Sequence, residues 1–234
     1  MKIDIIISAD QINEKVIKDR TVVVIDILRA TSVIITAINN GCKEIVPVLT
    51  TEEAFELKRK TSECLLCGER NAVKIDGFDL SNSPLDYTQG KVRGKTLIIT
   101  TSNGTRAIKG SIGARNILIG AIINGQAVSD RILELGNDVV IVNAGTYGNF
   151  SIDDFLCSGF IIDCILKKES NVILTDIAKT ANYVYKQNNN ITDFIKNASH
   201  YEKIKELNLL EDLDYCCRKN IISVVPELVD GKIA

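Results

Sequence analysis

The chain has 234 residues, of which 45% are hydrophobic and 25% charged, and its formal net charge is −2. This balance gives no general attraction to nucleic acid or to an anionic membrane, so an anion must be bound by local geometry. No segment reaches the roughly 18 apolar residues that cross a bilayer, and the N-terminus lacks the order of a signal peptide. We therefore expect a cytoplasmic protein that binds neither nucleic acid nor membrane.

Cysteine usage agrees with a reducing compartment. The seven cysteines form an odd set scattered through apolar stretches, which is typical of buried thiols rather than of a secreted disulfide framework. They are Cys42, Cys64, Cys67, Cys157, Cys164, Cys216 and Cys217.

Strand-like apolar runs alternate with helical patterns over the first 170 residues. The runs lie at 3–7, 21–28, 44–49, 64–67, 96–100, 116–119 and 138–143, and the helical patterns at 31–40, 51–61, 104–108, 124–135 and 152–167. Thr50 to Glu53 have the composition of a capped helix start, and Gly41 and Gly136 stand where helices would end. The alternation predicts an α/β fold: three α/β/α layers around a mostly parallel central sheet.

From about residue 170 helical patterns dominate, at 176–187, 191–197, 200–207 and 211–218, with a polar surface turn expected at 187–190. No Pro/Gly/Ser-rich linker separates this part from the rest. We therefore expect a single domain over residues 1–234, with the helical C-terminal region packed on the same core. The sequence does not fix the oligomeric state and is compatible with a homodimer.

Three apolar runs stop abruptly at short polar side chains and then become helical, as parallel strands do before an anion-binding helix start. At the first, Asp26 ends the run and is followed by Arg29, Thr31 and Ser32. A buried carboxylate is costly unless it is paired or binds a metal. Asp26 therefore either binds a ligand or has a structural role, pairing with Arg29 or capping the next helix, for which Thr31 or Ser32 is the expected N-cap.

The second junction, Thr100 to Arg106, combines hydroxyls, an amide, a turn glycine and a guanidinium. Backbone N–H groups and short donors there suit a phosphate or sulfonate, with Arg106 as a bidentate partner. The structural alternative is an ordinary capped helix start with an Asn-Gly turn. The candidate anion-binding residues are Thr101, Asn103, Gly104, Thr105 and Arg106.

The third junction places Asp153 and Asp154 in the first turn of a helix, where the helix dipole favours acidic residues whatever their function. Carboxylates are also the ligands that Mg²⁺ prefers. Between the first two junctions, Glu69 ends a short apolar run, and a Gly/Pro/Asx-rich segment from Asp76 to Pro84 contains Asn82. Glu69 could point into the same cleft as Asp26. The segment that contains Asn82 either adds donors to that cleft or is an ordinary turn-rich loop.

The sequence does not support several other catalytic or ligand-binding motifs. The C-x₅-R spacing from Cys64 to Arg70 begins inside a strand, and the Cys64 and Cys67 pair lacks the second pair of a zinc site. His200 is the only histidine, and its polar helical context predicts a surface position or a local hydrogen bond, which argues against a Ser-His-Asp triad. The G-x-G-x-x-G and G-x-x-x-x-G-K-[ST] motifs are missing, as is a second aspartate two residues after Asp26.

The residues that remain resemble a known family. Val24 to Ser32, Gly68 to Arg70, Gly77 to Pro84, Ser102 to Thr105 and Asp153 to Gly159 resemble, in order and spacing, the 2-phosphosulfolactate phosphatase family of coenzyme M biosynthesis. The resemblance extends to Val224-Val225-Pro226 near the C-terminus. It implies a Mg²⁺-dependent phosphatase that converts (2R)-2-phospho-3-sulfolactate into (2R)-3-sulfolactate and phosphate.

Oxygen chemistry and placement suggest the roles within that reaction. Asp26, Glu69 and Asp154 are expected to bind Mg²⁺, and Asp26, Arg29 and Asp154 to be catalytic. Further substrate contacts are expected from Thr31, Ser32, Arg70, Asn82, Thr101, Asn103, Gly104, Thr105 and Arg106. The attacking group is either water oriented by a carboxylate or one aspartate acting as nucleophile.

Two other functions stay open at this point. One is a phosphatase of the same scaffold acting on another small 2-phospho acid. The other is a non-catalytic binder of small polyanions, against which the internal carboxylates argue, because without a metal they would repel the ligand.

Overall fold

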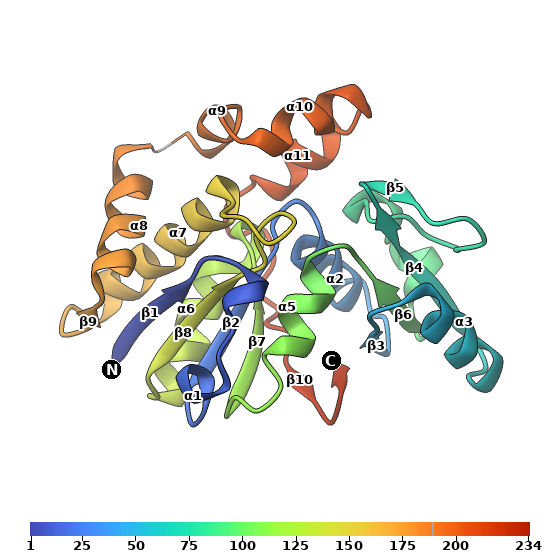
Figure 1. The fold of residues 1–234 in the computed structure, drawn as a ribbon, viewed down its shortest axis with the longest axis horizontal. Helices are drawn as coiled ribbons and strands as arrows, with labels where there is room; N and C mark the ends of the chain where they lie inside the picture. The colour runs from blue at the N-terminus through green and yellow to red at the C-terminus, as the bar shows by residue number, and fades with distance from the viewer. Residues whose placement is uncertain (189) are drawn as a thin grey trace.

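Two β-sheets stand beside each other in the computed structural model, which describes residues 1–188 and 190–234 (Figure 1). The first sheet is wholly parallel, with strand order β7-β2-β8-β1-β9. Every residue of β2 and β8 is buried, as expected for central strands covered on both faces. The strands are β1 (Lys2–Ile6), β2 (Thr21–Ile25), β7 (Asn116–Gly120), β8 (Val139–Asn143) and β9 (Ile173–Leu174).

The second sheet is mixed, with strand order β10-β11-β3-β6-β4-β5. Its three middle strands, β3 (Glu44–Pro47), β6 (Thr96–Thr100) and β4 (Cys64–Arg70), are parallel. Short antiparallel strands extend both sides: β5 (Val73–Lys74) pairs with β4, and β11 (Lys232–Ile233) joins β3 to β10 (Leu228–Val229).

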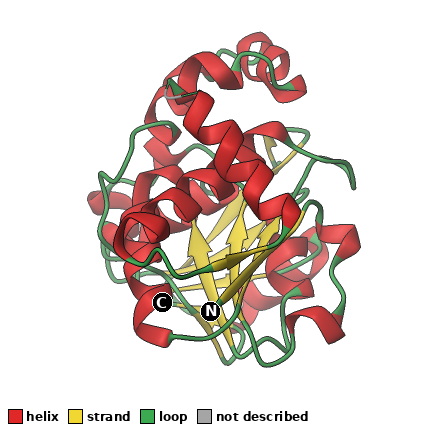
Figure 2. Cartoon of the chain, turned by 90° about the vertical axis from the view of Figure 1, so that its left-hand side faces the viewer, coloured by secondary structure: helices red, strands yellow, loops and turns green. Residues whose placement is uncertain are grey.

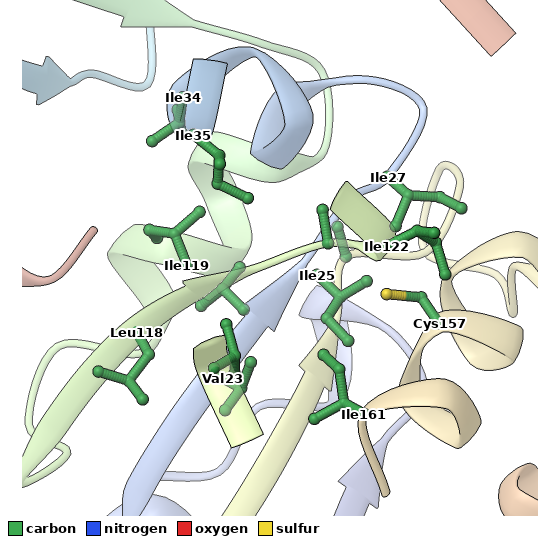
Figure 3. Packing of buried hydrophobic residues seen from close by; sticks show 14 of the residues in the cluster. Val23, Ile25, Ile27, Ile34, Ile35, Leu118, Ile119, Ile122, Cys157 and Ile161 are labelled. Atoms are coloured by element: carbon green, nitrogen blue, oxygen red, sulfur yellow. The ribbon is translucent and has the colours of Figure 1, made fainter. Parts of the chain in front are cut away.

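Helices α2 (Ala30–Asn39) and α5 (Gly104–Gly110) lie between the two sheets (Figure 1). Helices α6 (Gly125–Leu135), α7 (Ile152–Lys168) and α8 (Asp176–Gln187) cover the other face of the first sheet, and α3 (Thr51–Lys60) packs on the second. One hydrophobic core includes residues of both sheets. Figure 3 shows part of it, where Cys157 and Ile161 of α7 approach Ile25 of β2.

The C-terminal helices α9 (Ile191–Ile195), α10 (Ser199–Glu206) and α11 (Leu210–Cys216) lie above the carboxyl ends of the strands (Figures 1 and 2). Shorter elements are α1 (Glu14–Ile17), α4 (Gln89–Val92) and 3₁₀ turns at Ala9–Gln11, Pro84–Asp86 and Ile122–Asn124. Within the described ranges, no helix is long and apolar enough to cross a membrane.

The predicted α/β class with α/β/α layers is confirmed, and the structure divides the strands between two sheets. Thr50 caps α3 as expected, accepting a hydrogen bond from the Glu53 N–H at 3.1 Å, and Gly136 ends α6 in the left-handed conformation. The four two-residue strands are too short to leave a periodic pattern in the sequence. The surface turn predicted at 187–190 includes Asn189, which lies outside the described residues.

The expected N-cap of α2 is wrong. The helix begins one residue before Thr31, with Arg29 at the cap position. Thr31 Oγ1 instead donates to the carbonyl oxygen of Asp26 at 2.9 Å, and Ser32 Oγ donates to that of Ile27 at 2.9 Å. Both hydroxyls therefore stabilise the turn between β2 and α2 from inside the helix.

Candidate active site

A cleft of about 530 Å³ opens where the carboxyl ends of strands from both sheets meet helix α10. Its size is typical of a small-molecule site. One side, the strand-end wall, contains Asp26, Glu69, Ser102 and Asn103; the other, the helical wall, contains Ser199, His200 and Lys203 of α10. The lining is completed by Leu28, Arg29, Asn71, Ala72, Asn82, Thr146 and Tyr147.

Asp26 lies directly after β2 and is only 9% exposed. Its backbone N–H donates to Thr31 Oγ1 at 3.1 Å, and its Oδ1 accepts a hydrogen bond from the Ala30 N–H at 3.3 Å. Among the described residues, no hydrogen bond is found to Oδ2. Asp26 therefore caps α2 with one oxygen, as one structural alternative predicted, and keeps the other for the cleft; it does not pair with Arg29.

The pKa of Asp26 is raised to about 7, mainly by burial, which His200 opposes and the nearby Glu69 carboxylate reinforces. A carboxylate that titrates near neutrality in a cleft is a typical feature of an active site.

Gly104 allows α5 to begin against Asp26. A Cβ atom at this position would lie 2.7 Å from Asp26 Oδ2 and 2.5 Å from the Cβ of Ala30. Only a residue without a side chain fits there, because both contacts are far below ordinary van der Waals distance. The first and second junctions, which belong to different sheets, are thus in direct contact.

Asp154 lies behind the cleft rather than on its surface. Its Oδ1 accepts from the Ile27 N–H at 3.0 Å and its Oδ2 from the Gly145 N–H at 3.1 Å. Burial, followed by repulsion from Asp153 and Asp26, holds the pKa of Asp154 well above its usual range. In this arrangement both oxygens position the loops that follow β2 and β8.

Glu69 connects two loops of the second sheet while lining the cleft. Its Oε1 accepts from the Ser102 N–H at 2.7 Å, and its Oε2 accepts from the Ala72 N–H at 2.7 Å and from Ser102 Oγ at 3.3 Å. The carboxylate therefore fixes the ends of β4 and β6 relative to each other.

Arg29 is 4% exposed and bonded in two directions. Its guanidinium forms an ion pair with Asp212 of α11 and donates to the carbonyl oxygen of Ala72 at 3.0 Å. Ser83 Oγ donates to the other oxygen of Asp212 at 2.6 Å. This buried network joins the β2–α2 turn, the loop containing Asn82 and the C-terminal helices.

The predicted anion-binding residues divide into two groups. Of those at the second junction, Asn103 lines the cleft, and its Oδ1 accepts from the Tyr147 N–H at 3.1 Å. Thr101 and Thr105 instead bond to each other's backbone. Arg106 pairs with Asp10. The predicted contacts absent from the described lining of the cleft are Thr31, Ser32, Arg70, Thr101, Gly104, Thr105 and Arg106.

Arg70 is held by the strand-end backbone. It donates to the Glu69 carbonyl oxygen at 2.8 Å and to Thr100 Oγ1 at 2.9 Å. Its guanidinium thus stabilises the junction of β4 and β6, and the predicted substrate contact stays a prediction.

Sequence reasoning missed the helical wall. His200 and Lys203, one turn apart on α10, face the same cleft as Asp26. The imidazole Nδ1 lies 4.0 Å from Asp153 Oδ2 and 3.5 Å from Thr146 Oγ1. The Asp153 carboxylate raises the pKa of His200. The available signal was the uniqueness of His200, but its position depends on how α10 packs.

The cleft contains few side chains that could hold Mg²⁺. In the part of the chain that the structure describes, no three or more His, Cys, Asp or Glu side chains form a group able to hold a metal ion. Mg²⁺, however, commonly takes one or two protein oxygens, with water and substrate phosphate completing the shell. Two oxygens suit that pattern: Asp26 Oδ2, and Asn82 Oδ1, which is buried and has no hydrogen-bond partner among the described residues.

The two-sheet fold and the charged cleft define an α/β protein with a site for a small anionic ligand. The family model of 2-phosphosulpholactate phosphatase matches residues 6–231, so the chain belongs to this family of phosphoric monoester hydrolases.

Similar proteins in clostridia support this assignment. The chain is 60% identical over 234 residues to the "Probable 2-phosphosulfolactate phosphatase" of Clostridium acetobutylicum, covering 100% of both chains. Proteins with the same name in Clostridium kluyveri and Clostridium tetani are 63% and 62% identical over 100% of this chain, covering 97% and 100% of their own lengths.

Proposed function

We propose that the protein hydrolyses the phosphate monoester of (2R)-2-phospho-3-sulfolactate, releasing (2R)-3-sulfolactate and inorganic phosphate. The family and the names of its relatives support the reaction. The observation that carries the proposal is the free Oδ2 of Asp26 in a cleft that also contains Arg29, His200 and Lys203. A substrate with phosphate, sulfonate and carboxylate groups complements these three cationic side chains.

Asp26 is the carboxylate at the phosphoryl group. It accepts a hydrogen bond from the attacking water through Oδ2, while Thr31 and the Ala30 N–H fix its orientation. Arg29, already rigid through Asp212, presents its remaining N–H donors to the anion. Phosphoryl transfer depends mainly on positioning and charge stabilisation, so such fixed groups are the appropriate machinery.

Asp26 and Asn82 would hold Mg²⁺, with Glu69 nearby and substrate oxygens completing the coordination. When bound, the ion supplies positive charge to the phosphoryl oxygens. Asp154 acts in this scheme as a positioning residue, because its hydrogen bonds to Ile27 and Gly145 set the backbone on either side of Asp26.

Phosphate release from synthetic 2-phospho-3-sulfolactate tests the proposal. We expect turnover with Mg²⁺, loss of turnover in EDTA and recovery when Mg²⁺ is restored. The exposed variant Asp176→Asn serves as a control, since this side chain is fully exposed on α8, and its activity should match the wild type.

A parallel measurement with 2-phospholactate, which lacks the sulfonate, tests the specificity. Equal kcat/KM for both esters would reject the specific substrate and leave a general 2-phospho acid phosphatase. Saturable binding of sulfolactate without phosphate release at any Mg²⁺ concentration would reject catalysis altogether.

A further inference from the structure

The only histidine of the chain, His200, is the cleft-facing member of a carboxylate–imidazole pair. Asp153 enters from the first turn of α7 and is buried, with its Oδ1 accepting a hydrogen bond from Ser151 Oγ. Its Oδ2 faces His200 Nδ1 at 4.0 Å, and Thr146 Oγ1 lies 3.5 Å from the same nitrogen. A carboxylate on one ring nitrogen fixes the tautomer and leaves the other nitrogen for chemistry.

That other nitrogen, Nε2, is left for the cleft. His200 lines the same cavity as Asp26 and Arg29, and its side chain keeps 27% of its surface exposed. In the described residues, the hydrogen-bond and ion-pair contacts of His200 all involve Nδ1. The imidazole thus stands opposite the strand-end wall with an unused donor.

The reaction requires such a donor. When the P–O ester bond breaks, the electron pair stays on the oxygen at C2 of the lactate skeleton, and an aliphatic alkoxide is a poor leaving group unless it is protonated. The guanidinium of Arg29 does not release its proton in a protein, and its charge is already paired with Asp212. Asp26 is already assigned to the attacking water, so it does not supply the proton for the leaving oxygen.

We infer that His200 is the general acid of this phosphatase, donating the Nε2 proton to the leaving oxygen, and that Asp153 is the positioning residue that keeps the imidazole protonated and oriented. This inference rests on the proposed function. The water oxygen forms the new P–O bond while the ester P–O bond breaks, and the lactate oxygen takes the proton of His200. One water proton stays on the phosphate, and the other passes to solvent, which reprotonates the imidazole.

The charge surroundings of the imidazole agree with this role. Asp153 of α7 faces it from behind, Asp26 and Glu69 face it from the two sheets, and Lys203 shares its face of α10. The three carboxylates all raise the pKa of His200. Each of these carboxylates therefore favours the protonated imidazole, which is the form that a general acid must have before it donates.

The decisive experiment compares His200→Gln with the wild type on two esters. For 2-phospho-3-sulfolactate we expect kcat to fall about 10²–10⁴-fold. For p-nitrophenyl phosphate, whose phenolate leaves without a proton, we expect a loss below about tenfold. Lys205→Ala, an exposed change on the same helix, is the control for damage to α10 and should match the wild type on both.

Equal losses on both esters, or a higher KM with an unchanged kcat, would overturn the inference and make His200 a binding residue. If Asp26→Asn, and not His200→Gln, lost more activity on the sulfolactate ester than on the aryl ester, Asp26 would be the general acid. That result would also overturn the inference. Neither result changes the overall reaction proposed, which is rejected instead if the wild type releases no phosphate from the sulfolactate ester or has an equal kcat/KM for 2-phospholactate.

A second measurement uses the sulfolactate ester alone, and so applies even if the cleft rejects the aryl ester. The kcat of the wild type should fall at high pH as the imidazolium loses its proton, and this limb should be missing in His200→Gln. An unchanged limb would overturn the inference.

The positioning role of Asp153 has a readout independent of activity. Because the chain has one histidine, its imidazole C2 proton signal in a ¹H NMR titration needs no assignment. Asp153→Asn keeps Oδ1 for Ser151 but removes the charge, so the imidazole pKa should fall, and the basic limb of kcat should move to lower pH with it. An unmoved imidazole pKa would reject the pairing.

Discussion

The strand-end wall of the cleft is held by backbone hydrogen bonds, whereas the helical wall is held by side chains. Asp26 and Glu69 accept from backbone N–H groups of the loops beside them. His200 is positioned by the side chains of Asp153 and Thr146, which come from distant segments. The first wall carries the Asp26 and Glu69 carboxylates and the second carries His200 and Lys203, so both walls are needed to match the charges of the substrate and its cation.

This difference suggests a division of labour. The strand-end wall is built from turns that form with the sheets, so its geometry should survive changes elsewhere. The helical wall depends on the packing of α10 and α11 over the strand ends, and it is joined to the other wall through the buried pair of Arg29 and Asp212. Changes to each wall should therefore have separable effects on chemistry and on stability.

The largest effect is expected from Asp26→Asn, which removes the carboxylate charge from the strand-end wall with little change in shape. The kcat for phosphate release should fall at least about 10³-fold, because neither the attacking water nor the cation keeps its carboxylate partner. Steady-state kinetics with Asp176→Asn as the matched control measures it. A variant that retains near-native turnover at saturating Mg²⁺ would remove Asp26 from the mechanism.

Breaking the connection between the walls comes next. Asp212→Ala leaves the guanidinium of Arg29 buried without its partner, and losing one member of a buried ion pair typically costs about 3–5 kcal/mol. Urea unfolding should show this loss, with a raised KM for the substrate. Glu56→Ala, which removes an exposed pair with Lys60, should leave the unfolding midpoint unchanged. Equal midpoints for the two variants would show that the walls are not coupled through Arg29.

The pH dependence of the free energy of unfolding tests the burial of Asp26 without measuring its role in the reaction. Its pKa is about 7 in the folded protein and 3.8 as the ordinary value, so above pH 4 the native state binds more protons than the unfolded state. Stability therefore falls as pH rises toward 7. In metal-free buffer, Asp26→Asn should gain about 2–3 kcal/mol over the wild type between pH 5 and pH 8. A constant difference across this range would contradict the raised pKa.

The same contrast explains what the sequence could predict. Asp26, Glu69 and Asn103 lie at or close to the ends of apolar runs, so position in the sequence alone placed them near strand ends, and the cleft they form was expected. That these strands belong to two sheets was not visible, because a strand's neighbours depend on pairing across the chain. The approach of α5 to Asp26 through Gly104 brings the junctions together without a shared sheet.

The differences between the predicted site and the lining of the cleft have a common physical cause. Arg106 is of a residue type that commonly binds anions, but its guanidinium forms an ion pair with Asp10. Asp154 has the oxygens of a metal ligand, but two backbone N–H groups occupy them. His200 was predicted to lie at the surface or to form a local hydrogen bond, and the packing of α10 places it over the cleft. Residue type and order predict which groups are available, whereas tertiary partners decide which ones stay free.

The smallest effect tests how closely the strand-end wall is packed. Gly104→Ala would place a Cβ 2.5 Å from Ala30 and 2.7 Å from Asp26 Oδ2, and relieving such overlap typically costs about 1–3 kcal/mol. The midpoint temperature of thermal unfolding and kcat should both fall, because α5 must move away from the carboxylate that faces the substrate. Gly90→Ala on α4 should be neutral or slightly stabilising, because no atom of the described residues lies within 4 Å of the added Cβ. If Gly104→Ala lowers stability without changing kcat, the position of α5 against Asp26 matters for folding alone, and the orientation of the carboxylate rests on Thr31 and Ala30.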